Sequence, residues 1–77
     1  MQRSSSDKIT ACVSGQLRVL REKRGLSMNA LAGKAGLDQM AISRIEKGER
    51  SPQLRTVLMI CEALEVSLSD VLKECGG

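Results

Sequence analysis

The sequence predicts a small all-α domain, and three observations support that fold class. Apolar residues recur at spacings of three and four, the period of a helix, and no segment alternates with the period of a strand. Residues typical of helix starts and stops divide the chain into five segments of helical length. A length of 77 residues leaves room for one domain. We therefore expect a compact bundle of five helices around one core.

The core has to be built without aromatic residues. Phe, Tyr and Trp are absent, so aliphatic side chains, Met and Cys must fill it. A domain of this size buries only about 60% of the surface that its unfolded chain exposes. Self-association adds burial, so the composition favours a dimer.

The first helix is expected from residue 7 to residue 24. Its apolar residues follow one helical face at spacings of four, four and three: Ile9, Val13, Leu17 and Leu20. Gly25 supplies a left-handed C-terminal cap. Residues 1–6 are polar and serine-rich, so we expect them to be a flexible lead-in to a domain that covers residues 7–74.

Two short helices are expected next, over residues 28–35 and 39–47. Ser27 and Asp38 stand at their N-cap positions, and Gly36 ends the first of them. The link between the two is too short for an antiparallel hairpin, so they must cross at a steep angle. Small residues suit that crossing, and apolar ones face inward from the second helix: Ala32, Ala35, Ile42 and Ile45. The spacing predicts a helix-turn-helix.

Two further helices complete the expected bundle. The pair Ser51-Pro52 predicts an N-cap with proline at the first position of a helix that runs to Leu64 or Glu65. The apolar residues of this helix cover more than one stripe, so more than one of its faces should be buried. Ser67 and Asp70 form a capping-box pattern before a helix over residues 68–74, and residues 75–77 should be a loose tail.

The helix over residues 39–47 presents a polar outer stripe that contains no carboxylate: Gln39, Met40, Ser43, Arg44 and Lys47. Arg can donate two hydrogen bonds to guanine, Gln can pair with adenine, and Met can contact a thymine methyl group. A solvated surface is the alternative for any isolated helix. Its position directly after the turn favours DNA contact, and the net charge of +3 is compatible with a polyanionic partner.

The chain resembles the Cro and CI-type helix-turn-helix regulators, a family that includes phage repressors and restriction-modification controller proteins. The resemblance covers residues 13–72, and four segments carry it: RVLREKRGLS (18–27), LAGKAGL (31–37), AISRIEKGERSP (41–52) and ALEVSLSDVL (63–72). It implies a lambda-repressor-like domain whose base-contacting positions are Gln39, Met40, Ser43 and Arg44.

The resemblance also implies phosphate contacts around the start of the helix over residues 28–35 and in the loop after the helix over residues 39–47. These contacts fall on Ser27, Met28, Asn29, Lys47 and Arg50. Met28 departs from the family, which usually has Gln there, and a thioether cannot donate a hydrogen bond. Asn29 can partly replace that contact, and a packing role for Met28 is the alternative.

The family often pairs a Glu at the position of Glu46 with an Arg of the first helix. That Arg corresponds to Arg21 here. A lone carboxylate beside Ile42 and Ile45 would be costly, so we expect a partly buried, structural Arg21–Glu46 pair.

A homodimer is expected, because one helix in one groove contacts too few bases for useful specificity. Little chain follows Leu72, so the interface should come from the last two helices: Val57, Met59, Val66, Leu68 and Val71. The alternative is that these residues only complete the monomer core. The predicted function is a transcriptional regulator that binds a pseudo-palindromic operator and blocks or recruits RNA polymerase. An antitoxin or adaptor that uses the same fold for protein binding is the alternative function.

Enzyme function is not expected. The chain has no His, no glycine-rich phosphate loop and no nucleophile placed beside a base. Neither a cofactor nor a small-molecule ligand nor a metal is predicted. Cys12, Cys61 and Cys75 are odd in number and widely spaced, which predicts reduced thiols, with Cys12 and Cys61 as core or near-core residues. Reduced thiols, and no apolar run that could span a bilayer, favour the cytoplasm and exclude a membrane partner.

Overall fold

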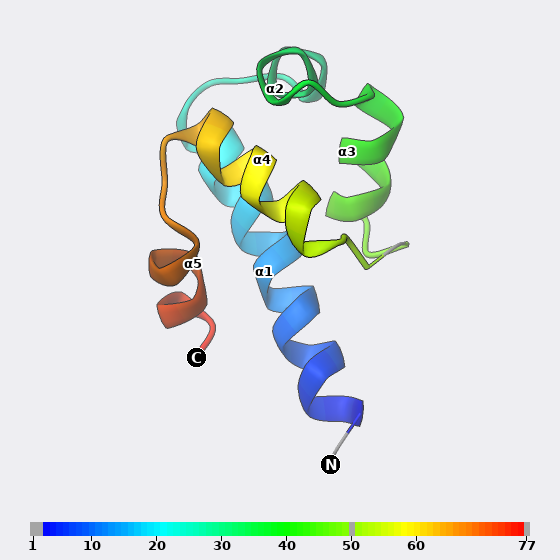
Figure 1. Cartoon of the computed structure of the whole chain (residues 1–77), viewed down its shortest axis with the longest axis vertical. Coiled ribbons are helices and arrows are strands. Elements are labelled where there is room, and N and C mark those ends of the chain that lie inside the picture. Colours follow the sequence, from blue (N-terminus) through cyan, green and yellow to red (C-terminus); the bar gives the residue numbers. More distant parts are fainter. Residues whose placement is uncertain (1–2, 50, 77) are drawn as a thin grey trace.

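Five helices make up the computed structural model, which describes residues 3–49 and 51–76 (Figure 1). They are α1 (Arg3–Lys23), α2 (Met28–Ala35), α3 (Gln39–Glu46), α4 (Leu54–Leu64) and α5 (Leu68–Glu74). The described residues contain no strand, which confirms the all-α prediction. None of these helices is both long and apolar enough to cross a membrane.

The core is formed where α1 to α4 meet. Its most deeply buried side chains come from all four of these helices: Leu17, Leu31, Ile42, Ile60 and Leu64. Burying each of them stabilises the fold by roughly 1.5–3 kcal/mol relative to exposure. Helix α4 crosses in front of α1, while α3 and α5 lie on opposite sides of the molecule (Figure 1). This arrangement leaves one face of α3 outside the core.

Helix α1 begins earlier than the sequence predicted. It starts at Arg3, so residues 3–6, expected to belong to the lead-in, are helical. Serine is only a moderately poor helix former, and extending an existing helix avoids the cost of nucleation. Residues 1 and 2 lie outside the described part of the chain.

Helix α4 begins later than predicted, at Leu54, and Pro52 precedes it. Gln53 is the N-cap residue, with an extended backbone at φ −71° and ψ 153°. Ser51-Pro52 is locally suited to a first helical turn, but the chain must also travel from the end of α3 to α4. An extended residue advances the chain about twice as far as a helical one, which explains the later start.

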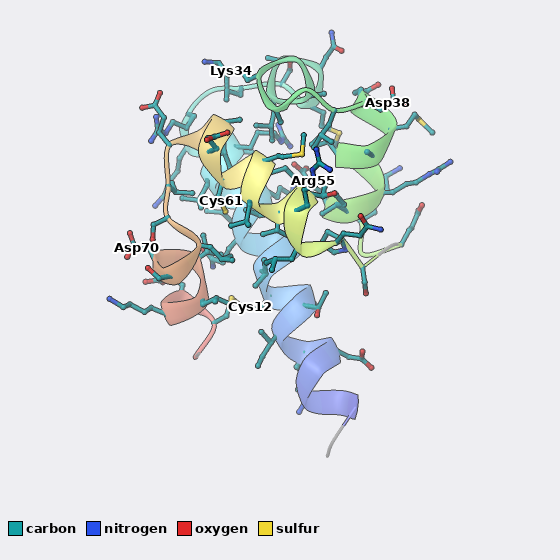
Figure 2. All side chains as sticks on the ribbon, viewed as in Figure 1. Cys12, Lys34, Asp38, Arg55, Cys61 and Asp70 are labelled. Carbon is teal, nitrogen blue, oxygen red and sulfur yellow. A yellow bond between two sulfur atoms is a disulfide. The ribbon has the colours of Figure 1, made fainter. Side chains whose placement is uncertain are left out.

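The prediction of three reduced thiols was wrong. Cys12 of α1 and Cys75, which follows α5, form a disulfide, and only Cys61 is a free thiol in the described residues. Cys75 was expected to lie in a loose tail, yet it is covalently joined to α1 and is partly buried. Figure 2 shows Cys12 on the side of α1 that faces α5.

Candidate nucleic-acid interface

The turn between α2 and α3 is fixed by caps at both ends of α2. The Ser27 hydroxyl accepts a hydrogen bond from the Ala30 amide at 3.0 Å. At the other end Gly36 takes a left-handed conformation with φ 71°, and the Leu37 amide donates to the Ala32 carbonyl at 2.9 Å. This six-to-one bond is the Schellman motif, which ends the helix and redirects the chain into α3.

Helix α3 has one buried and one exposed face. Ile42 and Ile45 are 1% and 2% exposed and anchor it in the core. The opposite face is open to solvent, and Met40 is 54% exposed there. Gln39 and Arg44 are also exposed, and Ser43 is half-buried. The four residues predicted to contact bases therefore all reach the surface. The buried Ile42 and Ile45 fix the opposite side of the same helix in the core.

The positive charges of the α3 face are not neutralised by neighbouring carboxylates. Arg18 and Arg24 lie elsewhere and form ion pairs with Glu22 and Glu65, at 3.4 and 3.5 Å. Arg44 and Lys47, by contrast, have no ion-pair partner among residues 3–49 and 51–76. Asp38 stands at the N-cap of α3, but its side chain makes no capping hydrogen bond. The exposed face of α3 thus carries positive charge that is available to a polyanion.

The residues predicted to contact phosphate lie around this face. Ser27 and Asn29 are exposed at the start of α2, and Lys47 is exposed directly after α3. Ser27 accepts from Ala30, and its own hydroxyl proton remains able to donate to an anion. Met28 is partly buried and packs against the core, in agreement with its packing alternative. Arg50, the last residue of this set, lies outside the described residues.

Arg21 and Glu46 come together beneath the interface. Arg21 donates from Nε and Nη2 to the two carboxylate oxygens of Glu46, at 2.7 and 3.0 Å. Arg21 Nη1 also donates to the Leu26 carbonyl at 2.7 Å. The two side chains are only 10% and 4% exposed. Hydrogen bonding to Glu46 raises the pKa of Arg21, against the opposing effect of burial. The pair therefore fixes the inner side of α3 to α1 and to the loop before α2.

The five residues predicted for a dimer interface separate into three groups. Val57 and Val71 are 6% and 2% exposed, so they belong to the monomer core and offer little side chain to a partner. Val66 lines a groove between α1 and α5. Met59 and Leu68 are half-buried and lie on a different, apolar surface.

We call this surface the α4–α5 apolar face. Two shallow grooves that share Leu54 define it, and its members are Ile9, Leu54, Leu58, Met59, Leu68 and Leu72. Leu54 and Leu58 are its most exposed members. These two residues were not among those predicted for the interface. Their spacing of four, which places two leucines on one face of the helix, was the signal that could have identified them.

No group of His, Cys, Asp or Glu among the described residues is placed to hold a metal ion.

The comparisons with known proteins agree with this geometry. A helix-turn-helix family model matches residues 17–71. The HTH-type transcriptional repressor RghR of Bacillus subtilis is 40% identical over 62 residues. That match covers 79% of this chain, which spans 46% of the length of RghR.

Two solved structures are similar over most of both chains. The restriction-modification controller protein C.AhdI from Aeromonas hydrophila superposes with a TM-score of 0.75 at 30% identity, covering 82% of this chain and 94% of that one. A variant of the controller protein C.Esp1396I gives a TM-score of 0.80 at 29% identity, covering 88% and 87%.

Proposed function

Because the chain belongs to the helix-turn-helix family of transcriptional regulators, we propose that it binds a pseudo-palindromic DNA operator as a homodimer. In each copy, α3 enters the major groove. The observation that carries this proposal is the exposed, carboxylate-free face of α3, whose Arg44 has no ion-pair partner in the described residues.

Four side chains contact base edges in this proposal. Arg44 donates to guanine O6 and N7, and Gln39 pairs with adenine N6 and N7. Ser43 accepts or donates a single hydrogen bond, and Met40 packs against a thymine methyl group. The buried Ile42 and Ile45 prevent α3 from rotating, so these side chains keep a fixed orientation toward the groove.

Phosphate contacts position the domain on the duplex. In this proposal, Ser27, Asn29 and the amides of the first turn of α2 contact one strand, and Lys47 contacts the other side of the groove. Such contacts are independent of sequence and release counterions. Binding is therefore expected to weaken steeply as salt is raised.

Dimerisation uses the α4–α5 apolar face. Each copy has one α3, a helix of eight residues. Successive major grooves on one side of B-DNA are about 34 Å apart, so the single α3 of one copy can occupy only one of them. Two copies joined through this face can present two α3 helices, because α3 and α5 lie on opposite sides of each copy (Figure 1). The bound dimer then controls transcription in the cytoplasm by blocking or recruiting RNA polymerase.

The experiment compares Arg44→Ala with Lys47→Ala. An operator is first selected from a random DNA pool, and dissociation constants are measured for it and for random duplex. Arg44→Ala should cost about 1–3 kcal/mol on the operator and relax specificity at one base pair of each half-site. Lys47→Ala should weaken both DNAs by similar factors and reduce the salt slope by about one.

Equal losses on operator and random DNA for both variants would contradict the assignment of Arg44 to base contact. Failure to bind any duplex at low salt would instead reject DNA binding and leave an antitoxin or adaptor role.

A further inference from the structure

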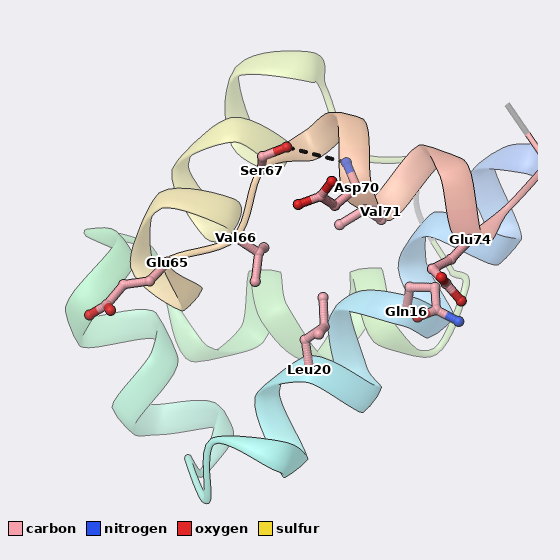
Figure 3. A pocket seen from close by; sticks show the side chains of 8 residues that line it. All are labelled: Gln16, Leu20, Glu65, Val66, Ser67, Asp70, Val71 and Glu74. Atoms are coloured by element: carbon pink, nitrogen blue, oxygen red, sulfur yellow. Dashed lines mark hydrogen bonds between the residues drawn. The ribbon is translucent and has the colours of Figure 1, made fainter.

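Helix α5 is short and packs on the rest of the domain through a few side chains. It has seven residues; Val71 is its one fully buried side chain, and Leu68 and Leu72 are partly buried against the core. A helix of this length does not persist alone in water, so its structure depends on docking. A groove of about 520 Å³ separates part of it from α1, between Leu20 and Gln16 on one side and Val66 and Glu74 on the other (Figure 3). The packing of α5 on α1 is therefore incomplete.

The disulfide joins the C-terminal end of α5 to α1. At its start, α5 is tied to α4 by the short link from Glu65 to Ser67. At its end, Cys75 is bonded to Cys12, with their Cα atoms 5.8 Å apart. Cys12 lies one helical turn before Gln16 on the same stripe of α1. The bond thus closes one end of the groove between the two helices.

The three cysteines differ in accessibility. Cys12 and Cys75 are both partly exposed, so small thiol reagents can reach them. Cys61 is buried in the core, and loss of hydration there raises the pKa of its thiol. Because the thiolate is the reactive form, Cys61 should be inert in the folded protein. The reactive pair is thus the one that joins α1 to α5.

We propose that Cys12 and Cys75 form a reversible thiol–disulfide switch that controls the docking of α5 on α1 and, through it, self-association of the protein. The link to self-association rests on the proposed dimerisation through the α4–α5 apolar face. Disulfides in cytoplasmic proteins are generally transient and redox-sensing, because glutathione and thioredoxin keep most thiols reduced in that compartment.

The oxidation requires a small-molecule disulfide such as oxidised glutathione. The thiolate of one cysteine attacks a sulfur of that molecule, forming a mixed disulfide and releasing one glutathione thiolate. The thiolate of the second cysteine then attacks the protein sulfur of the mixed disulfide and releases the second glutathione. The two protein thiols together lose two electrons and two protons, and oxidised glutathione becomes two molecules of the thiol.

The switch acts on the apolar face because that face is assembled from three helices. Ile9 comes from α1 and Leu54 from α4, whereas Leu68 and Leu72 come from α5. When α5 leaves α1, the groove loses the two leucines that α5 contributes to it. If docked α5 falls to about one third of molecules on reduction, the apparent dimer affinity falls about ninefold, because both copies of the dimer must have α5 docked.

The first test uses the full chain without DNA. After incubation with oxidised glutathione, thiol labelling in denaturant should find one reactive cysteine, and after reduction it should find all three. Reduction should lower Tm by at least about 10 °C, because removing such a cross-link weakens the fold and Tm is sensitive in a small domain. Three reactive thiols after oxidation, or an unchanged Tm, would overturn the proposal.

The second test measures self-association by sedimentation, again without DNA. With α5 docked in about one third of reduced molecules, the oxidised protein should dimerise about ninefold more tightly than the reduced protein. Cys75→Ser and Cys12→Ser should each abolish this difference, whereas Cys61→Ala should retain it. A redox response that persists in both serine variants, or equal affinities in the two states of the unaltered chain, would overturn the proposal. Because DNA is absent, failure of the operator experiment does not affect this result.

Discussion

Arg21 and Glu46 place two opposite charges almost out of contact with water, directly behind the exposed face of α3. Their two hydrogen bonds and the bond from Arg21 to the Leu26 carbonyl satisfy the guanidinium from three directions. A buried pair contributes little relative to well-packed apolar residues, but loss of one partner leaves a buried charge uncompensated. The value of this pair is therefore in the orientation that it imposes on α3.

Glu46→Ala should destabilise the domain by about 3 kcal/mol, because Arg21 would keep its charge in a buried position. Urea unfolding followed by circular dichroism measures the change. Arg18→Ala is the control, since Arg18 pairs with Glu22 in the open, where an ion pair contributes less than about 1 kcal/mol. Similar losses in the two variants would show that burial of the Arg21–Glu46 pair has no energetic consequence.

Two glycines, one within α2 and one directly after it, have different backbone conformations. Gly36 adopts φ 71° at the turn, whereas Gly33 lies inside the helix. A Cβ added at either position would meet no atom within 4 Å, so steric contact does not distinguish them. Only the backbone conformation differs between the two positions. Substituting each glycine by alanine therefore compares the cost of a left-handed conformation with the gain in helix propensity.

Gly36→Ala should destabilise the domain by about 1–2 kcal/mol, because a left-handed conformation brings Cβ close to a carbonyl oxygen. Gly33→Ala should stabilise it by about 0.5–1 kcal/mol, because alanine loses less backbone freedom in a helix. Thermal unfolding of the two variants beside the unaltered protein measures both effects. Changes of the same sign would mean that the turn geometry of the helix-turn-helix does not depend on Gly36.

The whole molecule separates its two proposed contact surfaces. The polar face of α3 lies on one side, and α5, which contributes to the apolar face, lies on the other (Figure 1). A DNA-binding domain that dimerises needs this separation, since one copy has to contact DNA and its partner at the same time. The two surfaces also differ in chemistry, because the α3 face carries Arg44 and Lys47, whereas aliphatic side chains and Met59 form most of the α4–α5 apolar face.

Leu58→Asp should weaken dimerisation at least about tenfold, because it would place an unpaired charge in an apolar contact. Sedimentation over a range of protein concentrations measures the change. Val19→Asp is the control, because Val19 is 42% exposed on α1 and Leu58 is 48% exposed on α4. Thermal unfolding should show that neither variant disrupts the monomer. Equal dimer affinities in the two variants would place the interface elsewhere.

The sequence by itself determined the features that depend on neighbouring residues. Helical periodicity and capping residues are local, so the bounds of α2 and α5 and the turn at Gly36 followed from spacing alone. The outward position of Arg44 followed for the same reason, since Ile42 and Ile45 fix which side of α3 faces the core. The family membership was likewise carried by short segments of sequence.

Tertiary structure decided the features that join distant parts of the chain. Cys12 and Cys75 are 63 positions apart, and nothing local shows that α5 returns to the same stripe of α1. Apolar periodicity shows that Val57 and Val71 avoid water, but it does not distinguish the monomer core from a dimer interface. In the folded domain, α5 packs against α1 and α4. This packing places Val57 and Val71 in the monomer core and leaves Leu54 and Leu58 exposed.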